Sequence, residues 1–344
     1  MPSDPTRDRA RTGRARSTAA RAARPEAHGR SRPPPPRRRS RPTAAPGPAD
    51  VGPGPPGWRQ DWAWVVGNLP AGRLSCCPVG YILLTNDDGL DSPALVPFAC
   101  ALAKVATVRT VVPDRERSWI SKAISRWDEL HVRELVRDGL ELVTVAGFPA
   151  DCTNLGVHSL FDTPPDMVVS GVNIGLNTGL GFFLSSGTVG AAMEGWIAGL
   201  PALAFSVGIP DQDREWKARI KQGEFADVWP RAAALSAEIV GTVRQSGFPA
   251  GVDLLNVNFP VGADLHTPRV VTRLANVGYE RLFRCKQEGI YVHDASGQIR
   301  ESGDLNGTDI SILRAGRVSI TPVRLAHAAK LDPELKRRLE KSSG

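Results

Sequence analysis

With 344 residues the chain is long enough for about two domains of roughly 150 residues, so it is not a mini-protein that depends on covalent staples. Its formal net charge of +7 is concentrated in residues 1–50, which hold 13 arginines against four acidic residues, whereas residues 51–344 hold 30 basic and 32 acidic residues. The composition therefore argues against a basic folded surface, and the five irregularly spaced cysteines exclude a disulfide framework and a zinc-finger pattern.

The first 78 residues are predicted to be a disordered Arg/Pro-rich tail and linker. Residues 1–56 hold 13 of the 29 prolines and show almost no apolar periodicity, so they cannot bury a core. The tail lacks the apolar core of a secretory signal, and the uncharged stretch 167–193 is too rich in Gly, Asn, Ser and Thr to cross a bilayer. Together with the odd number of cysteines, these features predict a cytoplasmic protein with no membrane anchor.

From Val79 onward, short β-rich runs alternate with helical stretches, which is typical of a mostly parallel sheet covered by helices. The pair Ser92-Pro93 is expected to cap a helix, and a long helix is expected over residues 224–244. Strands are predicted over residues 81–85, 107–112, 140–145, 166–170 and 202–207. We therefore predict an α/β fold with a Rossmann-like, mostly parallel sheet as the catalytic core, residues 79–260.

The residues after 260 are predicted to form a β-rich C-terminal oligomerisation arm and a terminal helix, residues 261–344. Their β-rich pieces are separated by glycine and proline, which favours hairpins or an extended arm. These pieces lie at residues 269–274, 289–293 and 318–323, and a charged helical segment follows at 333–341. A further β-rich piece, residues 254–258, directly precedes them.

Two adjacent aspartates, Asp87 and Asp88, follow the first predicted strand and precede Gly89. Ligands of open α/β sheets bind beyond the carboxyl ends of the strands, where this pair is expected to lie. Neighbouring carboxylates repel each other unless a cation lies between them, and oxygen-only ligands favour Mg²⁺ or Mn²⁺ over zinc. The alternative is that Asn-Asp-Asp-Gly is simply a turn, since these are residues that turns use.

Three further segments carry polar groups just after predicted strands or at the start of a helix. The charged loop 112–119 presents the hydroxyl of Ser118, and the Gly-rich segment 169–177 presents the amide oxygens of Asn173 and Asn177. Segment 185–194 is predicted to open a helix near Gly187 and Thr188, and its N-terminus suits a phosphate unless Ser186 or Thr188 simply caps it. Each segment also has a plain interpretation, as a solvated loop, a Gly-rich connection and an ordinary helix cap respectively.

A divalent ion on carboxylates beside an anion-binding helix N-terminus would form a phosphoryl-hydrolysis site. Competing machinery is missing from the sequence: it has no P-loop, nucleophile elbow, dinucleotide fingerprint or zinc-protease motif. The six histidines are scattered and are predicted to be surface or core residues.

From about Val79 to Pro322 the chain resembles the SurE (survival protein E) family of metal-dependent nucleoside-monophosphate phosphatases. The resemblance rests on ordered motifs: ILLTNDDG at 82–89, PDRERS at 113–118, PADC at 149–152, SGVNIGLN at 170–177, SGTVGAAMEG at 186–195, LPALAFS at 200–206 and SITP at 319–322. It implies one divalent ion per subunit, Mg²⁺ or Mn²⁺, held by Asp87, Asp88, Ser118 and Asn173. It also implies a homodimer or homotetramer, and a phosphate pocket lined by Ser186, Gly187 and Thr188 with Asn177 nearby.

The sequence departs from the family pattern near the implied site. Trp119 stands where the family usually has glycine, and Phe148 stands where it usually has threonine. The run 178–185 is apolar, where the family commonly has acidic residues and a tyrosine just before the S-G-T motif. We expect Trp119 to have an ordinary negative φ, because a tryptophan at positive φ would be strained, and its ring to anchor the loop or to bind a nucleobase.

Together the residues and the resemblance predict a phosphoric monoester hydrolase, a 5′-nucleotidase or acid-phosphatase-like enzyme acting on nucleoside 5′- or 3′-monophosphates with Asp87 and Asp88 as catalytic residues. The alternative is a nucleic-acid-binding protein that uses the Arg-rich tail, with a non-catalytic nucleotide-sensing core. Apart from the tail, no nucleic-acid partner and no membrane partner is expected.

Overall fold

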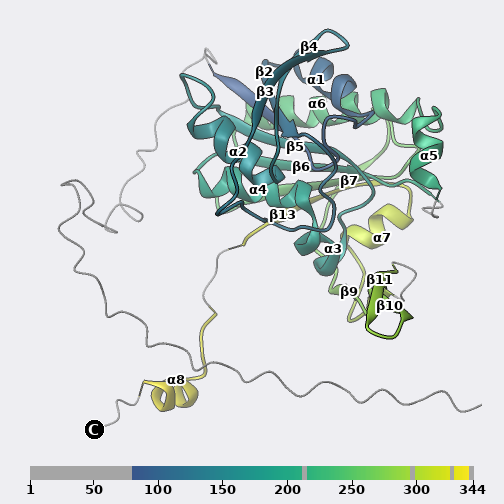
Figure 1. Cartoon of the computed structure of the whole chain (residues 1–344). Helices are drawn as coiled ribbons and strands as arrows, with labels where there is room; N and C mark the ends of the chain where they lie inside the picture. Colours follow the sequence, from purple (N-terminus) through teal and green to yellow (C-terminus); the bar gives the residue numbers. More distant parts are fainter. Residues whose placement is uncertain (1–79, 211–214, 295–298, 326–328, 341–344) are drawn as a thin grey trace, which may run out of the picture. The chain divides into compact units, whose positions relative to one another are not determined.

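The computed structural model of the chain describes residues 80–210, 215–294, 299–325 and 329–340, all of which belong to one unit, Arg73–Gly344 (Figure 1). The predicted tail of residues 1–78, and with it the nucleic-acid-binding alternative, lies outside the described residues. Within the described ranges, no helix has the length and apolarity needed to cross a membrane.

A nine-stranded sheet forms the centre of this unit, in the order β3-β4-β2-β1-β5-β6-β7-β13-β8. Six strands are joined by parallel pairing: β1 (Tyr81–Thr85), β2 (Thr107–Pro113), β4 (Leu140–Val145), β5 (Met167–Ile174), β6 (Ala202–Val207) and β7 (Leu254–Phe259). At the edges, β3 (Val132–Arg137) is antiparallel to β4, while β13 (Val318–Val323) is antiparallel to β7 and parallel to β8 (Arg269–Val271). The predicted α/β fold with a mostly parallel sheet is confirmed.

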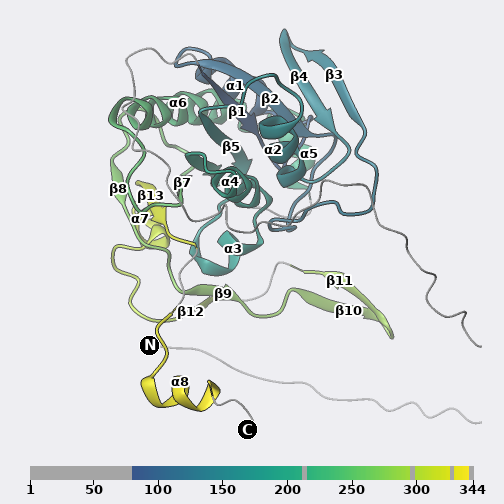
Figure 2. The same ribbon diagram turned by 90° about the vertical axis from the view of Figure 1, so that its left-hand side faces the viewer.

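Helices cover both faces of the sheet, as Figure 2 shows. Successive strand residues point to opposite faces, so Ile82 and Leu84 lie in one core cluster and Tyr81 and Leu83 in another. The first cluster is covered by α1 (Leu95–Leu102) and α6 (Val228–Ser246), and the opposite face by α2 (Pro149–His158) and α4 (Gly187–Ile197). Because both faces are buried, the central strands are rich in apolar residues on both sides, which is why the sequence shows them clearly.

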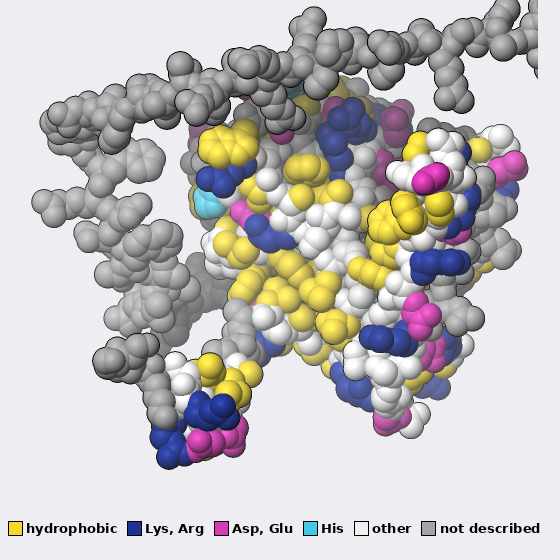
Figure 3. All heavy atoms as spheres, turned by 60° about the horizontal axis from the view of Figure 1, so that its bottom comes forward, with side chains coloured by type: hydrophobic (Ala, Val, Ile, Leu, Met, Phe, Trp, Pro, Cys, Tyr) yellow, Lys and Arg dark blue, Asp and Glu magenta, His cyan; other side chains and the backbone are white. Residues whose placement is uncertain are grey.

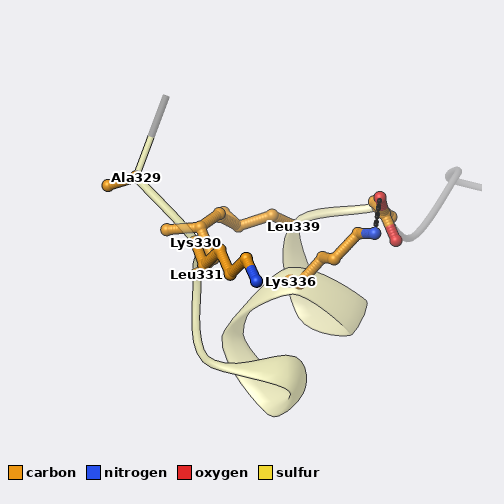
Figure 4. Close-up of a pocket in the computed structure, with 6 residues that line it drawn as sticks. Ala329, Lys330, Leu331, Lys336 and Leu339 are labelled. Atoms are coloured by element: carbon orange, nitrogen blue, oxygen red, sulfur yellow. Dashed lines mark ion pairs between the residues drawn. The ribbon is translucent and has the colours of Figure 1, made fainter. Parts of the chain in front are cut away.

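The remaining elements are shorter. Two antiparallel ribbons extend from the core: β9 (Val277–Tyr279) pairs with β12 (Ile299–Glu301), and β10 (Phe283–Gln287) pairs with β11 (Ile290–His293) (Figure 2). The remaining helices are α3 (Gly179–Ser185), α5 (Trp216–Lys221), α7 (Asp309–Arg314) and α8 (Pro333–Leu339). Figure 4 shows a hollow beside α8 that involves none of the candidate site residues, since its lining comes from Ala329, Lys330, Leu331, Lys336, Leu339 and Glu340.

Two helix starts differ from the sequence prediction. Ser92 does not cap α1, which begins at Leu95; the backbone of Ser92 instead closes two turns, donating to the Gly89 carbonyl (3.2 Å) and accepting from the Leu95 amide (3.3 Å). The long helix begins at Val228 rather than at residue 224, because Gly223 and Phe225 have positive φ angles, +94° and +64°, that interrupt a helix.

The division into a core and an arm at residue 260 stays a prediction. The residues after 260 supply the two ribbons, but they also return β8 and β13 to the main sheet.

Candidate metal and phosphate site

The turn that follows β1 presents the two predicted aspartates. Asn86 closes this turn with both ends of its amide, because its Nδ2 donates to the Gly89 carbonyl and its Oδ1 accepts from the Gly89 amide, both at 3.1 Å. Gly89 has φ +78°, and a Cβ there would lie 2.5 Å from the carbonyl carbon of Arg115. The turn interpretation and the ligand interpretation are therefore compatible: Asn86 and Gly89 build the turn, and Asp87 and Asp88 face other segments.

Asp87 is buried against the first turn of α4. The Thr188 hydroxyl donates to Asp87 Oδ1 at 2.5 Å. Burial raises the pKa of Asp87 to about 6 even though the hydrogen bonds from Thr188 lower it. A Cβ on Gly187 would lie 2.8 Å from Asp87 Cβ, so the absence of a side chain there lets the helix N-terminus approach the carboxylate. The start of α4 is thus built around Asp87.

Ser186 is the N-cap of α4, since its Oγ accepts from the Val189 amide at 3.1 Å. The cap interpretation is therefore correct for Ser186, and Thr188 uses its hydroxyl on Asp87. Any phosphate bound here would meet the positive end of the helix through its backbone rather than through these two hydroxyls.

Asp88 and Asn173 are brought together by the parallel pairing of β1 with β5. The Ile174 amide donates to Asp88 Oδ2 at 3.1 Å, so Asp88 lies beside the end of β5. The register of β5 with β6 shifts between Ser170 and Asn173, where a Cβ on Gly171 would lie 2.4 Å from the Phe205 carbonyl oxygen. After this bulge, Asn173 Nδ2 donates to the Gly175 carbonyl at 2.7 Å, which leaves Oδ1 as the end of the amide able to coordinate a cation.

Ser118 lies in the loop after β2, which is fastened to the same site. The Arg117 amide donates to the Asp87 carbonyl at 2.7 Å, and the Ser121 amide donates to the Ser185 carbonyl at 2.9 Å. The Ser118 hydroxyl donates a hydrogen bond to Glu116 Oε1 at 2.6 Å, so the lone pairs of Ser118 Oγ point away from Glu116 and can accept from a donor or bind a cation. Glu116 was not singled out in the sequence; it accepts this hydrogen bond from Ser118, and its negative charge contributes to the raised pKa of Asp87.

The expectation of an ordinary backbone at Trp119 is wrong. Trp119 has φ +60° and Ser121 has φ +54°, so the loop keeps a left-handed geometry of the kind that glycine adopts without strain. The hydrogen bond from Ser121 to Ser185 fixes the loop at this point and outweighs the local preference of the residue. The Trp119 ring packs edge-on against other aromatic rings and is 42% exposed.

Asn177 is held by a buried polar cluster that sequence reasoning missed. Its Nδ2 donates to Ser206 Oγ at 2.8 Å, its backbone amide donates to Asn258 Oδ1 at 2.9 Å, and its carbonyl accepts from Asn256 Nδ2 at 2.8 Å. The signal was present, because Asn256 and Asn258 alternate with apolar residues in the buried strand LLNVNF. The contacts of Asn177 thus direct it into the interior, where it positions the segment between β5 and α3.

The donor set of this site fits a hard divalent cation. It offers two carboxylates, a hydroxyl and an amide oxygen, which are the ligand types that Mg²⁺ and Mn²⁺ prefer. Burying the Asp87 carboxylate among neutral donors is unfavourable, as its raised pKa shows, and a cation beside it would offset this. Among the residues that the structure describes, no three His, Cys, Asp and Glu side chains are grouped to hold a metal, so neutral oxygen ligands would have to complete the site.

Comparisons with known proteins match this region. The family described as Survival protein SurE matches residues 82–281. A 5′-nucleotidase SurE of Methanocella arvoryzae is 34% identical over 248 residues, which cover 71% of this chain and 91% of the relative. A 5′-nucleotidase SurE of Geobacter metallireducens is 38% identical over 253 residues, with 71% and 91% covered. The crystal structure of the Sure protein from Aquifex aeolicus superposes with a TM-score of 0.60 at 29% identity, covering 76% of this chain and all of that one.

Proposed function

Because the chain belongs to the SurE family, we propose that it is a metal-dependent phosphomonoesterase that hydrolyses nucleoside 5′- or 3′-monophosphates to nucleoside and phosphate. The relatives named 5′-nucleotidase SurE support the nucleotidase activity. The observation that carries the proposal is the contact of Asp87 with the first turn of α4. Asp88 contacts the end of β5 next to Asn173, and the loop that carries Ser118 is bonded to the Asp87 carbonyl through Arg117. This arrangement combines a cation-binding and an anion-binding group at the carboxyl edge of a parallel sheet.

Each side chain of the site has a proposed part. Asp87 and Asp88 are the catalytic carboxylates and would hold one Mg²⁺ or Mn²⁺ ion, with Ser118 and Asn173 as neutral ligands. When bound, such an ion would offset the negative charge of the phosphoryl oxygens and lower the pKa of a coordinated water. Thr188 fixes the orientation of the Asp87 carboxylate, and Glu116 fixes the hydroxyl of Ser118.

The phosphate would be bound where the backbone of Ser186, Gly187 and Thr188 opens α4. Helix N-termini favour negative charge, and donors fixed before the reaction stabilise charge that develops on phosphoryl oxygens. Asn177 would contribute to this pocket indirectly, by fixing the segment that leads into α3 through its contacts with Ser206, Asn256 and Asn258.

We also propose a homodimer or homotetramer in the cytoplasm. The face at the bottom of Figure 1, where α3 and β9 lie, carries a group of hydrophobic side chains in Figure 3. On α3, Leu180 and Leu184 are 43% and 49% exposed, which favours burial against another subunit. Cys100, Cys152 and Cys285 are free thiols, which supports a reducing compartment. Light scattering on the purified protein would measure the oligomer, and a monomer at micromolar concentration would contradict it.

The test of the function is phosphate release from a panel of 5′- and 3′-nucleoside monophosphates. We expect release with Mg²⁺ or Mn²⁺, loss of activity after chelation, and recovery when the ion is returned. Absence of release from every nucleotide under all metal conditions would overturn the phosphatase proposal. Release that persists in chelator would contradict the metal dependence alone.

A further inference from the structure

Four aromatic rings from separate segments meet beside the candidate site, and we call them the aromatic cluster: Trp119, Phe182 of α3, Tyr279 of β9 and His293 of β11. Trp119 is at the centre, with ring centroids 5.7 Å from Phe182, 5.6 Å from Tyr279 and 5.1 Å from His293. Phe182 and Tyr279 are also in contact at 5.8 Å. All four contacts are edge-to-face, so the rings meet at angles and do not cover one another in a stack.

The aromatic cluster is only partly buried. Trp119 keeps 42% of its surface exposed, Phe182 and Tyr279 are half-buried, and His293 is exposed. An anchor that served only to hold the loop would be expected to bury its ring, and a loop that needed only the left-handed geometry at position 119 would be less strained with glycine. The exposed ring at a strained position therefore points to a ligand. This surface differs from the proposed subunit contact, because Phe182 is two residues from both Leu180 and Leu184 and so lies on another face of α3.

The aromatic cluster is attached to both halves of the candidate site. Trp119 directly follows Ser118, the proposed metal ligand. On the other side, Tyr279 Oη and Ser185 Oγ form a hydrogen bond of 2.8 Å, and Ser185 directly precedes Ser186, the cap of α4. These two connections tie the aromatic cluster to the segment that carries the proposed metal ligand and to the segment that leads into α4.

We propose that the aromatic cluster binds the base of the nucleotide, with Trp119 supplying the ring face on which the base stacks. This inference rests on the proposed function, because it names the part of the substrate that the same site would recognise. Every nucleobase has a π-face, so a stacking surface accepts purines and pyrimidines alike and distinguishes nucleotides from phosphate esters that carry no base.

A buried carboxylate holds the starts of the two segments that carry Phe182 and Tyr279. Asp309 Oδ2 accepts from the Gly179 amide at 2.7 Å and its Oδ1 accepts from the Ala275 amide at 2.9 Å. Gly179 begins α3, which carries Phe182, and Ala275 lies just before β9, which carries Tyr279. Rings held in this way lose little freedom on binding, which favours affinity.

The experiment compares a nucleoside 5′-monophosphate with ribose 5-phosphate, which has the same ester but no base. Base stacking is worth about 5- to 150-fold in binding. We expect Trp119→Ala to raise KM for the nucleotide by at least about fivefold and to leave KM for ribose 5-phosphate within about twofold, while Trp119→Phe retains most of the affinity. Trp127→Ala is the matched control, because Trp127 lies in the same loop region, is 83% exposed and stacks with Arg126; it should change neither substrate.

A binding measurement separates this inference from the proposed function. Calorimetric titration of adenosine into the full-length protein, with chelator present, needs neither metal nor turnover, and we expect Trp119→Ala to weaken this binding by the same factor. Equal losses on nucleotide and ribose 5-phosphate, or equal adenosine affinity in wild type and Trp119→Ala, would overturn the inference. If no phosphate is released from any substrate but adenosine binding still depends on Trp119, the phosphatase proposal fails and the base-binding surface stands.

Discussion

Gly187→Ala tests whether the close approach of α4 to Asp87 matters. The new methyl group would lie 2.8 Å from Asp87 Cβ and 3.0 Å from both Asp87 Oδ2 and the Arg117 carbonyl oxygen. Neither neighbour is free to move, because the Arg117 amide is bonded to the Asp87 carbonyl and the Asp87 carboxylate is bonded to Thr188. The first turn of α4 must therefore shift away from the carboxylate.

The size of the effect follows from two terms. Inserting a methyl group into a packed region costs about 1–3 kcal/mol of folding free energy. The shift also weakens the hydrogen bond that orients the Asp87 carboxylate. We expect the lost orientation to remove at least about 1.4 kcal/mol of transition-state stabilisation, which lowers kcat/KM at least about tenfold. Urea unfolding would measure the first term, and nucleotide hydrolysis at saturating Mg²⁺ the second.

Gly241→Ala is the matched control for this change. In α6 the added Cβ would meet the two methyl groups of Val105 at 3.6 and 3.9 Å, which are ordinary contacts, and alanine favours a helix over glycine by up to about 1 kcal/mol. We expect this variant to be as active as wild type and slightly more stable. A Gly187→Ala protein with wild-type stability and turnover would refute the dependence of the site on the contact between α4 and Asp87.

Three further substitutions probe neighbouring groups. Asp88→Asn keeps an oxygen for the Ile174 amide but removes a charge, so it should lower kcat by at least tenfold, about 1.4 kcal/mol, and weaken metal binding in a titration; unchanged turnover with metal bound would sink the ligand assignment. Glu116→Gln can still accept a hydrogen bond from Ser118 but loses its charge. It should raise the Mg²⁺ concentration for half-maximal activity by roughly two- to fivefold, since exposed charges interact by up to about 1 kcal/mol. An unchanged Mg²⁺ dependence would argue against a contribution of the Glu116 charge to metal binding. Asp309→Asn places an NH₂ group against a backbone N–H and should destabilise the fold by about 1–3 kcal/mol in urea and raise KM for nucleotides, whereas wild-type values for both would contradict its positioning role.

The parts of the fold that follow from apolar runs were predictable from the sequence. β4, β6 and β13 have the predicted bounds, because continuous apolar or β-branched residues between turn residues allow few other structures. β3 was missed because its sequence VRELVR mixes charged and apolar residues, and as an edge strand it leaves most of them exposed. α2 was missed as well, since its sequence PADCTNLGVH is short and rich in small and polar residues.

The candidate site was predictable in its residues but not in its contacts. The acidic pair, the Gly-rich segment and the helix start were visible as motifs, and the structure joins Asp87 to Thr188 and Asp88 to Ile174. That Asp87 would be buried depends on a helix that begins 100 residues later, which no local pattern encodes. The backbone at Trp119 was mispredicted for the same reason, because a tertiary hydrogen bond between Ser121 and Ser185 outweighs a local preference.

Two departures from the family pattern, read separately in the sequence, are one feature of the structure. Trp119, which replaces the usual glycine, packs on Phe182. Phe182 belongs to the run 178–185, which is apolar where the family commonly has acidic residues. The tyrosine commonly found before the S-G-T motif is replaced by Ser185, and Tyr279 reaches that serine from β9 with its hydroxyl. Fewer carboxylates near the start of α4 mean less repulsion of a phosphate dianion, and more aromatic surface means more attraction for a base. The same set of residues would therefore favour binding of both ends of one nucleotide, the phosphate and the base. For this reason we expect substitutions at these positions to have effects that depend on one another.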